Sequence, residues 1–253
     1  MKRIALCLHG QPRGLGLLSP CSTPSIEYQN KNLIQRDDIS VDVFFHTWDY
    51  SDSISNFKNT ITNLYQPKKF LFECPLEWNF VQQFDDGSTP PKHIYSNYSH
   101  YHSLYFSNLK RMEHEQKNGF QYDWVISTRF DVALNVRLNF DTMNEKMIYQ
   151  SDFNKDHYIS NGFKVQNPVF AVGNGVNMEK YSDILPNINI LLNLCGSIDG
   201  HSVFGANIKH QGLIDCMMYL NMNHPFTPRG RDASPNFFVR DDYELFFNIN
   251  KSF

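Results

Sequence analysis

A basic and an acidic residue stand close together directly after an apolar segment of the chain, at Arg129 and Asp131. Residues 124–128 are β-forming, so the pair is expected at the end of a buried strand. An aspartate in that place can ligate Mg²⁺ or Mn²⁺, which a nucleotide would share through its phosphates. Arg129 can neutralise the same phosphates or hold Asp131 in a structural ion pair. The residues by themselves favour neither interpretation.

Two more polar clusters follow predicted strands, HGQPRG from residue 9 and HTWD from residue 46. In open α/β sheets, ligands bind beyond the carboxyl ends of strands. Glycine permits close backbone approach and arginine binds anions with two donors, although an ordinary exposed turn would look the same. The three clusters together predict a concave polar site with aromatic walls. Its members are His9, Gln11, Arg13, His46, Trp48, Asp49, Arg129 and Asp131.

The elements that must position these clusters can be read from the hydrophobic pattern. Strands are predicted at 3–8, 41–49, 68–73, 124–128, 146–150 and 167–174. Helices are predicted at 23–36, at 99–119 and at 178–196, the last interrupted at Pro186, while 83–97 is rich in turn residues and expected to be exposed. This order predicts one α/β domain with a mixed, mainly parallel sheet flanked by helices.

The composition of the chain limits its possible domain number, partners and location. A chain of 253 residues with 41% hydrophobic and 19% charged residues suits a single globular domain. A formal charge of -3 and a pI near 6.3 argue against a nucleic-acid partner. Five cysteines without a CxxC pair predict reduced, mostly buried thiols. The first apolar run is too short for a signal peptide and no membrane span follows, so a cytoplasmic protein is expected.

Three stretches, YDWVISTRFDV, IALCLHGQPR and VDVFFHTWD, together resemble small nucleotide-sugar glycosyltransferases of the GT-A fold. Such enzymes occur in phages, algal viruses and bacterial surface-polysaccharide clusters, and a viral member would act in the host cytoplasm. The likeness covers roughly residues 1–180. This strand end carries the family's DxD motif, whose last aspartate binds the metal and the diphosphate. Arg129-Phe130-Asp131 keeps that aspartate but replaces the first one by arginine, which puts metal dependence in question.

The resemblance implies a GT-A-like, Rossmann-like single domain over 1–253, with a nucleotide-binding half at 1–135 and an acceptor-binding half at 136–253. It implies a UDP- or GDP-linked sugar as donor, Mn²⁺ or Mg²⁺ as cofactor, and a glycan or glycoprotein as acceptor. Asp131 would hold the metal and Arg129 the diphosphate. The implied donor-binding residues are His9, Gly10, Gln11, Arg13, Thr47, Trp48 and Asp49, with Ser99 and Ser103 on a helix that faces the donor. Plain solvent exposure is the favoured explanation for the two serines.

A sugar transfer that inverts the anomeric centre needs a carboxylate to accept the acceptor's proton. The candidates are Asp199, Asp241 and Asp242. Asn167 and Pro168 occupy the place where the family often has an acidic residue, so no base is assigned there. His201, His210 and His224 are candidate metal ligands or simply structural histidines. Arg229, Arg231 and Arg240 lie in a segment that would be either a lid over the diphosphate or a solvated tail.

These observations predict a glycosyltransferase. Two rivals remain open: a non-catalytic nucleotide- or carbohydrate-binding module on the same fold, and a sugar nucleotidyltransferase, whose glycine-rich signature HGQPRGLG matches only loosely.

Overall fold

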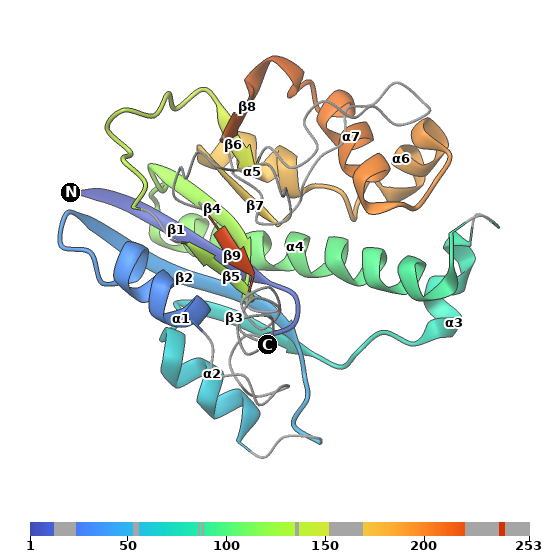
Figure 1. Cartoon of the computed structure of the whole chain (residues 1–253), viewed down its shortest axis with the longest axis horizontal. Helices are drawn as coiled ribbons and strands as arrows, with labels where there is room; N and C mark the ends of the chain where they lie inside the picture. The colour runs from blue at the N-terminus through green and yellow to red at the C-terminus, as the bar shows by residue number, and fades with distance from the viewer. Residues whose placement is uncertain are drawn as a thin grey trace, which may run out of the picture.

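The computed structural model describes residues 1–12, 24–52, 56–85, 87, 89–134, 137–151, 169–220 and 238–240. Within these ranges a seven-stranded sheet has the order β3-β2-β1-β4-β7-β6-β8, with helices on both faces (Figure 1). The predicted α/β class, with a mixed and mainly parallel sheet flanked by helices, is confirmed.

Four parallel strands form the first half of the sheet. They are β1 (Lys2–His9), β2 (Ile39–Trp48), β3 (Lys69–Glu73) and β4 (Trp124–Arg129). Each one agrees with a strand expected from the sequence. Between them, α1 (Pro24–Gln29) continues into the π-helical segment η2 (Asn30–Ile34), and α2 (Phe57–Tyr65) precedes β3. The pattern of apolar residues did not reveal α2.

Helix α4 (Pro91–Asn118) is the longest helix in the described part of the chain. Proline fits its first turn because backbone N–H groups there have no partner within the helix, so the N–H that proline lacks is not missed. Gly119 ends it with a φ of 66°, a left-handed conformation that glycine adopts without strain. The prediction that 91–97 is an exposed turn was therefore wrong. Two short helical segments, α3 (Trp78–Val81) and η3 (Gln82–Phe84), precede it.

One strand in the second half of the sheet runs opposite to its neighbours. Strand β7 (Phe170–Gly173) runs antiparallel to both β4 and β6 (Ile148–Ser151), while β8 (Met217–Leu220) is parallel to β6. Strands β5 (Val132–Leu134) and β9 (Phe238–Arg240) form a separate antiparallel pair. The helices here are α5 (Gly175–Ser182), α6 (Ile188–Cys195), α7 (Gly200–His210) and the turn η4 (Ile214–Cys216).

Each face of the sheet has its own hydrophobic core. One core joins the sheet to α4, α5, α6 and α7, and the other joins it to η2 and α2 (Figure 1). Strand alternation assigns residues to the two faces, so that Cys7 faces α4 whereas Leu6 and Leu8 face the opposite core.

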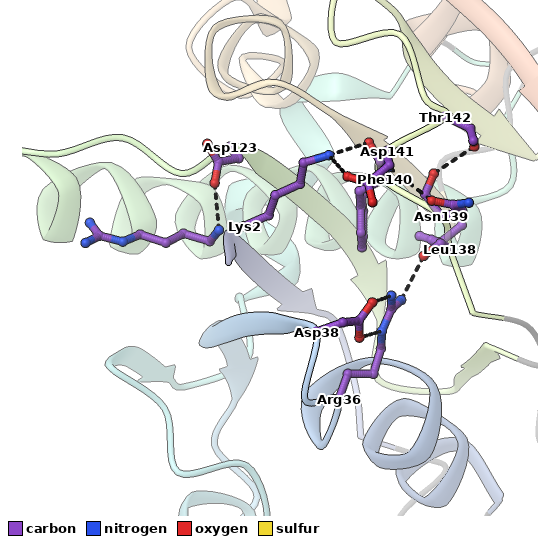
Figure 2. A network of polar contacts seen from close by, with 10 residues as sticks. Lys2, Arg36, Asp38, Asp123, Leu138, Asn139, Phe140, Asp141 and Thr142 are labelled. Atoms are coloured by element: carbon purple, nitrogen blue, oxygen red, sulfur yellow. Dashed lines mark hydrogen bonds and ion pairs between the residues drawn. The ribbon is translucent and has the colours of Figure 1, made fainter.

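Polar contacts near the amino ends of β1 and β2 join these strands to residues 138–141 (Figure 2). Lys2 donates to the carbonyl of Phe140 at 2.9 Å and pairs with Asp141, while Arg36 pairs with Asp38 and donates to the carbonyl of Leu138 at 2.8 Å. The segment after β5 is thereby fastened to the starts of β1 and β2. These contacts lie at the opposite end of the strands from His9, His46 and Arg129.

None of the described helices has the length and apolarity needed to cross a membrane. Cys7 and Cys195 are buried free thiols, as expected, but the free thiol of Cys74 is exposed.

Candidate functional site

The parallel register brings the three predicted strand ends side by side. His9 pairs with His46 on β2 and with Arg129 on β4. Paired residues of parallel strands point to the same face, and their strand neighbours Cys7 and Phe44 belong to the core under α4. His9, His46 and Arg129 therefore form a row of nitrogen-bearing side chains between the carboxyl ends of the sheet and α4.

Asp131 and Arg129 form a bidentate ion pair in the turn that leaves β4. Arg129 Nε donates to Asp131 Oδ1 at 2.7 Å, and Nη2 donates to Oδ2 at 2.5 Å. Asp131 is only 2% exposed, whereas the Arg129 side chain is 21% exposed. The structure thus contains the ion pair, and both carboxylate oxygens are engaged in it. A metal at Asp131 stays a prediction.

His9, which is fully buried, and His100, which is partly buried, make an unusual pair of rings beside Arg129. Their rings meet edge to face with centroids 4.9 Å apart. Both ring nitrogens of His9, and Nε2 of His100, are buried without a hydrogen-bond partner among the described residues. Buried polar atoms in proteins are almost always paired. The pair is therefore a position where a bound molecule would find hydrogen-bonding groups already in place.

Burial keeps both imidazoles neutral. It lowers the pKa of His9 well below its ordinary value, and electrostatic interactions with His100, Arg129 and His46 lower it further. Burial lowers the pKa of His100 to about 3, with a further contribution from Arg129 that Asp131 partly opposes. At neutral pH each ring can therefore donate one hydrogen bond and accept another.

The same face of the sheet continues in polar residues toward β6. Ser127 and Gln150 lie in one register row through Ala171 on β7. Both are buried, and the hydroxyl of Ser127 and the whole amide of Gln150 have no partner among the described residues. The sequence analysis missed them because a serine and a glutamine inside apolar strands carry no chemical signature of their own.

A second cluster surrounds His46. Its Nδ1 lies 2.8 Å from Ser103 Oγ on α4, and its Nε2 lies 2.7 Å from Glu73 Oε2 at the end of β3. His102 Nε2 lies 2.7 Å from the same Glu73 oxygen. Ser103 Oγ also accepts a 2.6 Å hydrogen bond from the backbone N–H of Gly10, which has a φ of 88°. Ser103 is thus buried against the strand ends rather than exposed.

Charge in this cluster is concentrated on Glu73. The contacts with His46 and then His102 lower the pKa of Glu73 to about 2, so it is a carboxylate at neutral pH. Burial lowers the pKa of His46, and this effect exceeds the raising effect of Glu73. We take His46 as neutral because the ring is fully buried whereas Glu73 is partly in water. Glu73 and His102 were missed, although the rule that sites lie at strand ends applies to β3 as well.

The other predicted residues on β2 have different surroundings. Trp48 is buried and packs against the rings of His46 and His102. Thr47 alternates to the opposite face of the sheet. Asp49 pairs with Lys58 at 2.6 Å, and hydrogen bonds from Lys58 and then Ser51 lower its pKa to about 2.

The remaining candidates are scattered. Gln11 donates to the Tyr50 hydroxyl at 2.6 Å, and Ser99 is buried on α4. Asp199 is the N-cap of α7 and accepts from the backbone N–H of Ser202 at 3.0 Å. His201 lies in the first turn of α7 and His210 ends it. The candidates that lie outside the described residues are Arg13, Asn167, Pro168, His224, Arg229, Arg231, Asp241 and Asp242; of Arg240 only the strand position is described.

Comparison with known proteins gives likeness in structure but not in sequence. No protein family matches the sequence, and no curated protein matches it. Among solved structures, the apo form of mouse xyloside xylosyltransferase 1 matches with 10% sequence identity and a TM-score of 0.45, over 87% of this chain and 84% of that one. A match at this level does not establish a shared activity.

Proposed function

We propose that this protein is a glycosyltransferase that moves a sugar from a UDP- or GDP-linked donor to a glycan or glycoprotein. The observation that carries the proposal is the set of buried ring nitrogens of His9 and His100 that lack a partner among the described residues, beside Arg129 at the carboxyl ends of parallel strands. Sheets of this class bind nucleotides at that place. The resemblance of the strand-end motifs to nucleotide-sugar enzymes supplies the choice of ligand.

The reaction needs a cation where the leaving group departs. The oxygen of the acceptor hydroxyl attacks the anomeric carbon, and the bond from that carbon to the diphosphate oxygen breaks. The diphosphate keeps the bonding electrons, and the hydroxyl proton passes to a base or to water. Arg129 is the candidate cation because its guanidinium is partly exposed and held in place by Asp131. In the proposal, His9 and His100 donate hydrogen bonds to the bound sugar nucleotide.

Asp131 has the ligand chemistry of a Mg²⁺ or Mn²⁺ site, because hard cations prefer carboxylate oxygens. A divalent ion bound there would neutralise charge on the departing diphosphate. Arg129 engages both oxygens of Asp131, so metal binding requires the guanidinium to turn toward the phosphates. The proposal therefore assigns Arg129 and Asp131 to the diphosphate end of the donor.

Thermal unfolding with UDP, GDP, CDP, ADP and TDP, their sugar forms, and each with and without Mn²⁺ tests the proposal. A ligand that binds only the folded protein raises its Tm. We expect one diphosphate to raise the Tm selectively, and its sugar form to lose the sugar to an acceptor. Selective binding without any transfer would instead identify a binding module. Pyrophosphate release from a nucleoside triphosphate and a sugar phosphate would identify a nucleotidyltransferase.

Two variants locate the diphosphate. Arg129→Gln keeps a hydrogen bond to Asp131 but removes the charge, so diphosphate affinity should fall about tenfold or more, because charged hydrogen bonds contribute about 1.5–3 kcal/mol. Affinity for the uncharged nucleoside should hardly change. Asp131→Asn should remove any gain from Mn²⁺. Arg137→Gln and Asp52→Asn, both at exposed positions, are the matched controls. Equal losses for diphosphate and nucleoside would show that Arg129 has only a structural role.

A further inference from the structure

Three side chains from three elements converge on one point near the carboxyl end of the sheet. His46 comes from β2, Glu73 from β3 and His102 from α4, and their ligand atoms all lie within 4.8 Å of one another. His46 is fully buried, the His102 side chain is 13% exposed and that of Glu73 is 34% exposed. This cluster shares no residue with the Arg129–Asp131 pair.

The hydrogen bonds around Ser103 allow His46 to carry its proton on Nδ1. Ser103 Oγ accepts the N–H of Gly10 and lies 3.1 Å from the carbonyl oxygen of His46, to which it can donate its proton. When it does so, the ring is the donor in the 2.8 Å contact between His46 Nδ1 and Ser103 Oγ. A neutral imidazole protonated on Nδ1 has a lone pair on Nε2.

This lone pair faces a carboxylate. His46 Nε2 and Glu73 Oε2 are 2.7 Å apart, and in this tautomer a positive centre between the two atoms would stabilise the contact. A second proton on the His46 ring would stabilise only the contact between His46 and Glu73. A metal ion would serve His46, Glu73 and His102 together, since all three present a ligand atom to the same space.

We propose that His46, Glu73 and His102 bind a Zn²⁺ ion. Two imidazole nitrogens and one carboxylate oxygen are a donor set that zinc accepts, with a fourth position open to water or another ligand. Ligand bonds of about 2.0–2.1 Å place neighbouring tetrahedral ligand atoms about 3.3 Å apart. The 2.7 Å contacts therefore need to open by about half an ångström. The partly exposed side chain of Glu73 can make that movement.

The surroundings fit such a site. Ser103 holds His46 Nδ1 by a hydrogen bond, the arrangement that fixes the tautomer and orientation of metal-binding histidines. Trp48 and Phe106 pack against the His102 ring and limit access of water. The exposed fractions of Glu73 and His102 place the open fourth position on the solvent side. A bound ion would join the edge strand β3 to β2 and to α4.

Calorimetric titration of the metal-free protein with Zn²⁺ alone tests the site, and it needs no enzymatic activity. We expect one equivalent to bind, and Glu73→Gln and His102→Ala each to weaken binding at least tenfold. Glu77→Gln and His93→Ala are matched controls, because these residues are exposed and lie near the ligands in sequence. All variants carry Cys74→Ser, which removes an exposed thiol beside Glu73 that could bind zinc by itself.

Substituting Co²⁺ distinguishes the ligands by their absorption. Nitrogen and oxygen ligands give visible bands without a thiolate charge-transfer band, and that spectrum should be lost in His102→Ala. Absence of zinc binding, or equal affinity in Glu73→Gln, His102→Ala and the controls, would overturn the proposal. Binding that disappears with Cys74→Ser alone would overturn it too. Because Glu73→Gln keeps the shape of the side chain, it reports on the metal even if His102→Ala folds poorly.

Discussion

At the scale of single residues, the neutral pair His9 and His100 makes stability depend on pH. Both have a lower pKa in the folded than in the unfolded protein, so below pH 6.5 the unfolded chain binds more protons. The stability they contribute is complete above pH 6.5 and declines as the pH falls toward about 3, the folded-state pKa of His100. Each such histidine lowers the free energy of unfolding by about 2 kcal/mol when the pH falls from 7 to 5.

Urea unfolding of His100→Gln at both pH values, with a chelator present, checks this prediction. The variant should lose about 2 kcal/mol less than the wild type on going from pH 7 to pH 5. His93→Gln, at an exposed position on the same helix, should behave as the wild type does. An unchanged pH dependence in His100→Gln would show that His100 titrates normally in the folded protein.

Part of the candidate site can be proposed from the sequence at this scale. Arg129 and Asp131 are conspicuous as two charges after a buried strand, and the parallel register does bring Arg129 beside His9. Glu73 ends a strand in the same way, but its partner His102 lies on a helix. The rotation of that helix about its axis decides which side chains face the sheet, and the polar residues on it gave no clear direction.

At the scale of elements, the hydroxyl of Ser103 joins α4 to the ends of β1 and β2. Ser103→Ala would leave the Gly10 N–H and His46 Nδ1 buried without partners, so we expect a loss of about 1–3 kcal/mol in unfolding free energy. Ser107, one turn later and equally buried, bonds only to the carbonyl of Leu104 in its own helix. Ser107→Ala should cost clearly less. Chemical denaturation of both variants measures the difference, and equal losses would contradict the role given to Ser103.

The start of α4 also shows what local sequence cannot decide. Residues 91–97 begin with a proline, directly follow Pro90 and are mostly polar, and this composition favoured a turn. Ile94 and Tyr98 are nevertheless buried against the core shared with α7, and this packing extends the helix back to Pro91. Tertiary contacts of that kind become visible only when the partner helix has been placed.

At the scale of the whole molecule, the expected nucleotide-binding and acceptor-binding halves share one sheet. Strand β7 pairs directly with β4, so the strands of both halves belong to one continuous hydrogen-bonded sheet. We predict a single cooperative unfolding transition. Tryptophan fluorescence reports only on the first half, because Trp48, Trp78 and Trp124 all lie there, whereas circular dichroism reports on the whole chain. The two urea curves should coincide, and separate midpoints would indicate two independent units.

The strands expected from the sequence supply six of the seven sheet members, but their spatial order did not follow from pattern alone. Alternating strands and helices favoured a parallel sheet, which holds from β3 to β4. The reversal at β7 depends on how the chain returns to the sheet after β6. An apolar run such as that of residues 170–173 predicts a strand but does not distinguish parallel from antiparallel pairing.

The reversed strand has a consequence for how the protein is made. While the chain emerges from the ribosome, β1, β2 and β3 can assemble with β4, yet the free edge of β4 has to wait for β7. That strand begins only at Phe170, long after β4 ends at Arg129. At about 5–20 residues per second the delay lasts a few seconds, during which a strand beginning Trp-Val-Ile offers open backbone groups to neighbouring chains. Products truncated between β4 and β7 would therefore be the aggregation-prone fragments of this protein.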